Sequence, residues 1–153
     1  MNKLKAFIYS ALLNFELAML LLTILVLPNI SLSTKFALLL NAKPLEYLCL
    51  IPFGITVYLG KQLSEYLRIY EKEEKEIYSW KGYVQYQIAI YSGIVYSLIF
   101  TIFGVVAWVI NKPINWKGSL LIGAVIGSII TLISMEVNRH QMRKIVIDTI
   151  QQQ

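Results

Sequence analysis

The sequence predicts an all-α integral membrane protein of four helices, with both termini in the cytoplasm. Three observations lead to this prediction: apolar residues make up 57% of the 153 residues, charged residues make up 15%, and the charges cluster between long uncharged segments. Soluble domains average about 45–50% apolar and about 25% charged residues, and their surface helices carry a polar face. The pattern therefore indicates a chain whose solvent is largely lipid.

The first apolar segment, residues 7–27, is long enough for a membrane-spanning helix. Lys3 and Lys5 precede it, as in a signal peptide. However, the segment exceeds the usual apolar core of about 7–15 residues, contains polar residues, and lacks a small-x-small cleavage site. We therefore expect it to remain as the first span and to end at Pro28.

Three further spans are expected at residues 45–60, 88–110 and 118–137. The second follows Pro44, is short for a crossing, and is expected to continue as a helix beyond the membrane. These spans and the loop 61–82 form a transmembrane domain of residues 1–137, and residues 138–153 form a cytoplasmic tail.

Two aromatic residues are expected to anchor the third span at the two membrane surfaces. Tyr86 and Trp108 would lie about 33 Å apart on a straight helix, which is close to the thickness of the hydrocarbon layer. Tyrosine and tryptophan are enriched at both interfaces, because their rings are apolar and their tips are polar.

The distribution of positive charge predicts the orientation. Ten Lys and Arg residues lie in the N-terminal segment (2), the 60–82 loop (5) and the tail (3), against four in the two connections on the opposite side. Because short cytoplasmic segments carry the excess of Lys and Arg, the termini and the central loop are expected inside, in a bacterial inner membrane.

Glu16 lies near the middle of the first span, with Asn14 two residues earlier. An ionised carboxylate in hydrocarbon is costly, so Glu16 should face a protein partner, face water, or be protonated. The functional interpretation is a cation or proton site, or a polar contact that holds subunits in register. The structural interpretation is a protonated or hydrogen-bonded glutamate between helices that is satisfied by Tyr and Ser side chains of the third span. A single acid makes a poor relay, which favours the structural interpretation.

Small residues recur every four positions on the fourth span and form one stripe for close helix packing. The stripe consists of Ser119, Gly123, Gly127 and Thr131. Its GxxxG pair lets another backbone approach closely, either within the chain or in a second copy. Gly93 and Ser97 offer a complementary groove on the third span, which slightly favours packing within the chain.

The segment 61–81 is predicted to form an amphipathic helix that projects from the second span and binds a cytosolic protein. It contains five basic and five acidic residues, and this balance argues against headgroup binding. The expected contact residues are Leu63, Tyr66, Leu67, Tyr70, Glu71, Glu74 and Ile77. Alternatively, the apolar stripe packs on its own neighbours or on the tail, where Met142, Ile145, Val146 and Ile150 share one helical face.

Catalytic and ligand-binding motifs are missing from the sequence. It has a single histidine, His140, a single aspartate, Asp148, and no phosphate-binding glycine loop, nucleophile elbow or HExxH motif. We therefore expect no enzymatic activity, no cofactor and no metal. The Lys and Arg residues that give the net charge of +5 lie beside apolar spans, where they determine the topology. We therefore expect no nucleic-acid partner.

These features predict a membrane scaffold or sensing subunit that forms a homo-oligomer and docks a cytosolic partner. The alternatives are an ion- or proton-conducting protein centred on Glu16 and a bacteriocin or toxin immunity protein. Span count, topology and cytosolic layer resemble the four-span subunit of Kiwa, a two-gene bacterial anti-phage system. That resemblance covers most of the chain and implies a cytosolic partner in antiviral defence, but it assigns no residue role.

Overall fold

The computed structural model describes residues 15–29, 35, 47–67, 81–109 and 114–150. Every regular element in these ranges is helical: α2 (Phe15–Leu21), η1 (Leu22–Val26), η2 (Leu27–Asn29), α4 (Leu50–Leu67), α6 (Lys81–Val109) and α7 (Ile114–Ile150). Two segments, Tyr83–Val109 and Trp116–Met142, are long and apolar enough to cross a membrane. The expected all-helical class is confirmed for the described residues.

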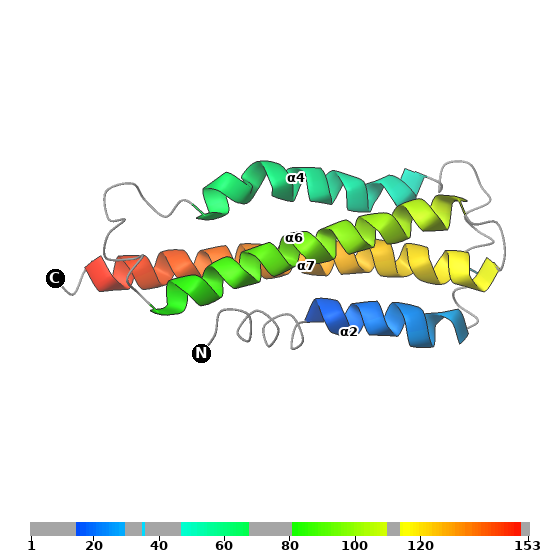
Figure 1. Cartoon of the computed structure of the whole chain (residues 1–153), viewed down its shortest axis with the longest axis horizontal. Helices are drawn as coiled ribbons and strands as arrows, with labels where there is room; N and C mark the ends of the chain where they lie inside the picture. The colour runs from blue at the N-terminus through cyan, green and yellow to red at the C-terminus, as the bar shows by residue number, and fades with distance from the viewer. Residues whose placement is uncertain (1–14, 30–34, 36–46, 68–80, 110–113, 151–153) are drawn as a thin grey trace.

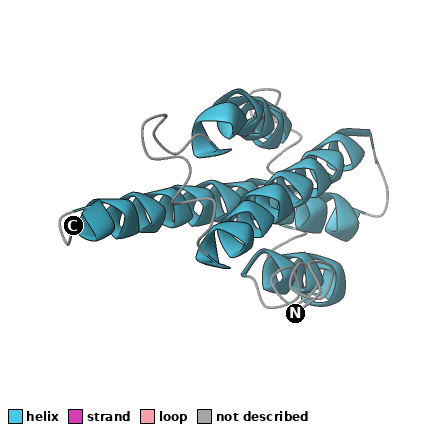
Figure 2. Cartoon of the chain, turned by 60° about the vertical axis from the view of Figure 1, so that its left-hand side comes forward, coloured by secondary structure: helices cyan, strands magenta, loops and turns pink. Residues whose placement is uncertain are grey.

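The helices form a layered arrangement rather than a square bundle. α6 and α7 make the most extensive contact and form a central pair, with α4 on one side and α2 on the other (Figures 1 and 2). α4 ends, α6 begins and α7 ends on the left of Figure 1, which we call the extension end; α2 begins near the middle and runs to the right, as α6 does. The segments therefore alternate in direction.

Two helix boundaries differ from those predicted from the sequence. α7 runs through residue 137, the expected border between span and tail, because no glycine or proline follows Gly127. α4 begins at Leu50, after a short 3₁₀ turn at residues 47–49. Pro52 lies in its first turn, where a missing backbone N–H costs nothing.

The first apolar helix does not keep α-helical geometry to its end. After α2, η1 is a π-helical turn closed by the N–H of Leu27 and the carbonyl of Leu22, and the 3₁₀ turn η2 follows with Pro28 in it. Ser119 on α7 donates a hydrogen bond of 2.5 Å to the backbone carbonyl of Thr23, within the π turn. The irregular turn thus lies where α2 meets α7.

Larger side chains of neighbouring segments lie directly against the helix backbone at three glycines, Gly93, Gly123 and Gly127. We call these positions the glycine notches. A methyl group at Gly127 would overlap the ring of Phe100, and one at Gly93 would press on Met135. A methyl group at Gly123 would overlap the Thr23 side chain. The α6–α7 and α2–α7 contacts are therefore close because one side has no side chain.

The described residues expose many large apolar side chains and bury several polar ones. Large apolar side chains are exposed along residues 15–26, 47–58, 91–109 and 116–137, which we call the apolar belt. Buried polar side chains are Glu16, Thr23, Ser92, Ser97, Ser119, Ser128 and Thr131. A soluble protein rarely exposes an apolar surface this extensive, whereas membrane helices pack through small and polar residues.

The anchors expected on the third span differ in their exposure. Trp108 is 60% exposed within the belt, whereas Tyr86 is only 8% exposed. Tyr86 packs near Tyr83, with 6.5 Å between ring centroids, in a core shared with Leu59 and Met135. Trp108 thus has the exposure of an interfacial anchor, and Tyr86 is a core residue.

The notches lead to a stability prediction. Gly127→Ala should destabilise the protein by about 1–3 kcal/mol, because the added methyl overlaps the buried ring of Phe100. Gly54→Ala is the matched control, since Gly54 also lies within a helix but has no atom within 4 Å of an added methyl. Thermal unfolding of both variants in the same detergent would measure the difference, and equal stability would contradict the close packing.

Candidate functional site

A small hydrophobic core joins three helices at the extension end. Leu59 of α4, Tyr83, Tyr86 and Ile90 of α6, and Met135 and Met142 of α7 are buried together. Belt residues end at Tyr58 on α4, Tyr91 on α6 and Val137 on α7, so Tyr83, Tyr86 and Met142 lie beyond the belt. The three helix ends therefore continue as one packed unit, which we call the extension layer.

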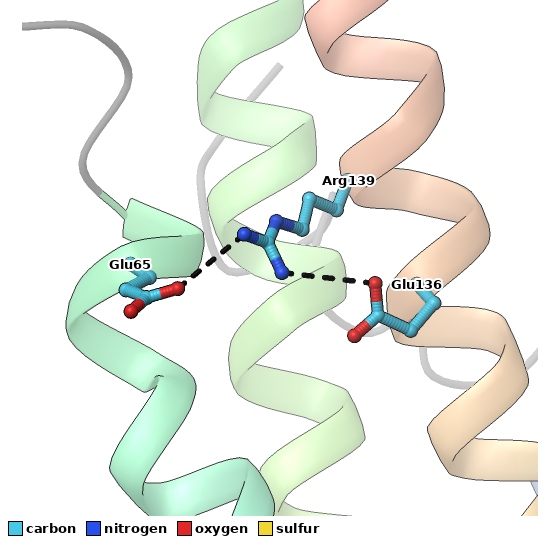
Figure 3. A network of polar contacts seen from close by, with 3 residues as sticks. All are labelled: Glu65, Glu136 and Arg139. Atoms are coloured by element: carbon cyan, nitrogen blue, oxygen red, sulfur yellow. Dashed lines mark hydrogen bonds and ion pairs between the residues drawn. The ribbon is translucent and has the colours of Figure 1, made fainter.

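An arginine on α7 lies between two carboxylates and links α7 to α4 (Figure 3). Arg139 on α7 reaches Glu65 on α4 at 3.4 Å and Glu136, one turn earlier on α7, at 3.8 Å. The Glu65 side chain is 60% exposed, so water screens much of the attraction and the pair adds little stability. Its geometric effect is to hold the end of α4 beside α7.

The expected partner-binding residues fall partly in the described chain. Leu63 is half-buried and packs against the core of the extension layer, so its side chain contacts residues of its own chain. Tyr66 and Leu67 belong to α4. Tyr70, Glu71, Glu74 and Ile77 lie outside the described residues. Among the described side chains of the layer, the exposed polar ones are Lys61, Ser64 and Glu65 on α4, Gln85 on α6, and His140, Gln141 and Lys144 on α7.

The four residues of the small stripe are all buried within the chain. Ser119 bonds the Thr23 carbonyl, Gly123 receives the Thr23 side chain, and Gly127 receives Phe100. Thr131 donates to the Gly127 carbonyl at 2.9 Å. The stripe thus faces α2 and α6 of its own chain, and these positions leave no room for a second copy.

Glu16 is 2% exposed and lies between helices of its own chain. Its carboxyl is close enough to the Tyr96 phenol on α6 for an electrostatic interaction. Among the described side chains no Lys, Arg or His pairs with it. Tyr96 belongs to the expected third span, as the structural interpretation of Glu16 requires. Asn14 lies outside the described residues.

A cluster of three hydroxyl groups between α4 and α6 did not emerge from the sequence. The Thr56 hydroxyl contacts the Ser97 hydroxyl at 2.5 Å, the Thr101 hydroxyl at 2.7 Å and the Ser97 carbonyl at 3.1 Å. Thr101 donates to the same carbonyl at 3.0 Å. The sequence contains one indication of this cluster: Ser97 and Thr101 are four residues apart and therefore lie on the same face of a helix. Nothing in the sequence indicated Thr56 as their partner.

The described residues contain no group of three or more His, Cys, Asp or Glu side chains that would hold a metal ion. Cys49 is half-buried and lies near the start of α4. Its carbonyl oxygen lies over Gly104 of α6, where a methyl group would come within 2.9 Å. Cys49 therefore takes part in helix packing.

Comparison with protein families, with curated proteins and with solved structures finds no match for this chain. The functional argument therefore rests on the geometry of the extension layer, the apolar belt and the buried polar groups.

The hydroxyl cluster yields a second prediction. Thr56→Val keeps the side-chain shape but removes the hydroxyl shared by Ser97 and Thr101, so it should cost about 1 kcal/mol. Thr56→Ser keeps the hydroxyl and loses only a methyl group, so its free energy of unfolding should be closer to that of the parent protein. Unfolding titrations in mixed micelles would compare them; a valine variant as stable as the serine variant would argue against the cluster.

Proposed function

We propose that this chain is a non-enzymatic membrane scaffold or sensing subunit that crosses the bilayer four times and presents the extension layer to a cytosolic protein. The observation that carries the proposal is the continuation of α4, α6 and α7 beyond the apolar belt as one packed unit.

The extent of the belt on every described helix supports four membrane spans. Exposed apolar residues cover about 27 Å of α6, from Tyr91 to Val109, and about 32 Å of α7, from Trp116 to Val137. These lengths match a hydrocarbon layer of about 30 Å. α2 and α4 expose apolar side chains as well, although their described parts are shorter. In the proposed membrane, lipid contacts all four helices.

The positive charges support a cytoplasmic position for the extension layer. Lys61, Arg139 and Lys144 lie at or beyond the border of the belt at this end. Cytoplasmic flanks of membrane helices carry the excess of Lys and Arg. The proposed location is therefore the inner membrane of a bacterium, with both termini in the cytoplasm.

The surface of the layer has the chemistry of a protein-binding site. It carries basic, acidic and amide side chains, such as Lys144, Glu65 and Gln141, on helices fixed by a common core. Rigid helices cost little entropy on binding, so modest contacts give useful affinity. We propose that the chain also forms a homo-oligomer, through a face other than the small stripe, and acts with its partner in anti-phage defence.

The proposed orientation predicts opposite labelling at two exposed lysines. Lys35 follows the first span, and Lys144 lies in the extension layer. In a Cys49→Ser background, a membrane-impermeant maleimide added to spheroplasts should label Lys35→Cys and spare Lys144→Cys until the membrane is permeabilised. The reverse pattern would invert the topology, and labelling of both residues would contradict a sealed four-span arrangement.

The docking proposal predicts a partner whose binding depends on the layer. Mild-detergent purification from the native host, followed by mass spectrometry, should recover a cytosolic protein. Lys144→Glu reverses a charge on the layer and should reduce recovery roughly tenfold, as a loss of about 1.4 kcal/mol would do. Lys35→Glu is the matched control and should leave recovery unchanged. Purification of the parent as a clean monomer would count against docking.

A further inference from the structure

We propose that the π turn after α2 is a conformational switch set by α7. While α2 is packed on α7, the Ser119 hydroxyl supplies a hydrogen bond that Pro28 cannot give, and residues 22–28 keep the π geometry. When that contact is lost, the same residues return to α-helical geometry. This inference is independent of the partner-docking function.

The π turn changes which backbone donor is available to the Thr23 carbonyl. In an α-helix each N–H binds the carbonyl four residues earlier, so the Leu27 N–H would bind the Thr23 carbonyl. In this structure the Leu27 N–H instead binds the carbonyl of Leu22, five residues earlier. The corresponding donor for Thr23 would be the N–H of residue 28, but Pro28 has no N–H. The π geometry therefore needs a donor for Thr23 from elsewhere.

Ser119 of α7 is that donor. Its hydroxyl donates to the Thr23 carbonyl at 2.5 Å, and both residues are 0% exposed. A buried carbonyl without a partner is costly, and in membrane helices Ser and Thr side chains of neighbouring helices satisfy groups that a proline leaves unpaired. The hydroxyl of Thr23 itself donates to the Met19 carbonyl at 2.7 Å. The π geometry thus depends on a hydrogen bond from another helix.

The packing of Thr23 ties this hydrogen bond to the position of α2. The Thr23 side chain lies in the glycine notch at Gly123, one helical turn after Ser119 on α7. α7 also contacts the 3₁₀ turn that follows, in which Leu27 and Pro28 are buried. The hydrogen bond and the notch therefore hold the same residue, and movement of α2 away from α7 removes both.

The α-helical geometry does not require a donor from α7. In that geometry the Leu27 N–H returns to the Thr23 carbonyl, and Pro28 leaves the carbonyl of Ile24 without its donor instead. Ile24 is 37% exposed and lies close to the end of the helix, where carbonyl groups ordinarily lack backbone donors. The two geometries therefore differ in whether Thr23 relies on α7, which gives the switch its two states.

A double-mutant cycle tests whether Ser119 replaces the N–H that residue 28 lacks. Ser119→Ala should lower the melting temperature of the full chain in detergent by about 2–4 °C, as the loss of one hydrogen bond does in a chain of this length. Pro28→Ala restores an N–H at position 28, so in that background Ser119→Ala should cost less than half as much. Equal losses in the two backgrounds would overturn the proposal.

Two comparisons separate the hydroxyl of Ser119 from its packing. Ser128 is also buried on α7, but it donates to the Ala124 carbonyl of its own helix at 2.6 Å, so Ser128→Ala should cost the same in both backgrounds. Ser119→Thr and Ser119→Val add similar bulk and differ in the hydroxyl. The threonine variant should melt higher than the valine variant, and equal melting temperatures would contradict the hydrogen bond.

An NMR measurement tests the change of geometry itself. Val26–Leu27 is the only Val–Leu pair in the sequence, so labelling with carbonyl-¹³C valine and ¹⁵N leucine selects the Leu27 amide. Its resonance should move in Ser119→Ala, because its acceptor changes from the Leu22 carbonyl to the Thr23 carbonyl. The resonance should stay in place in Ser128→Ala. A Leu27 resonance that does not move in Ser119→Ala would show that the π turn persists without its donor, and would overturn the switch.

Discussion

Close approach of α6 and α7 is the constraint on which the other contacts depend. In the proposed membrane, lipid is as apolar as leucine, so the helices would gain nothing by hiding apolar surface from it and would associate through close packing and hydrogen bonds. Gly93 accommodates Met135, and Gly127 accommodates Phe100. The central pair then supplies the surfaces on which α4 and α2 lie. Larger residues at either glycine would separate the pair and loosen both outer helices.

The helical class and the approximate positions of the helices followed from the sequence, because they depend on local runs of apolar residues. The small stripe was recognised for the same reason, since its four-residue period is visible in one segment. Which neighbour fills each notch depends on distant parts of the chain. Nothing local indicated that Thr23 would face Gly123 or that Thr56 would join Ser97 and Thr101. Tyr86 was expected at the membrane surface, because its type is typical of interfaces, but tertiary packing places it in a core.

Polar groups have two distinct roles in the two halves of the molecule. Along the apolar belt they are buried, and Ser128 and Thr131 donate hydrogen bonds to carbonyls of their own helix. Beyond the belt, Glu65, Glu136 and Arg139 form a charged network that water partly screens. Glu16 is the exception, since it is a carboxyl group that lies buried along the belt.

The unbroken course of α7 has a mechanical consequence. This helix contacts α2, α4 and α6, and its 37 residues form a rod about 55 Å long. Gly123, where α2 meets it, lies about 14 Å from one end and about 40 Å from the other. A rod that tilts about this point moves its extension end about three times as far as its near end. A small tilt of α7 at the seat of α2 would therefore be magnified at the extension end.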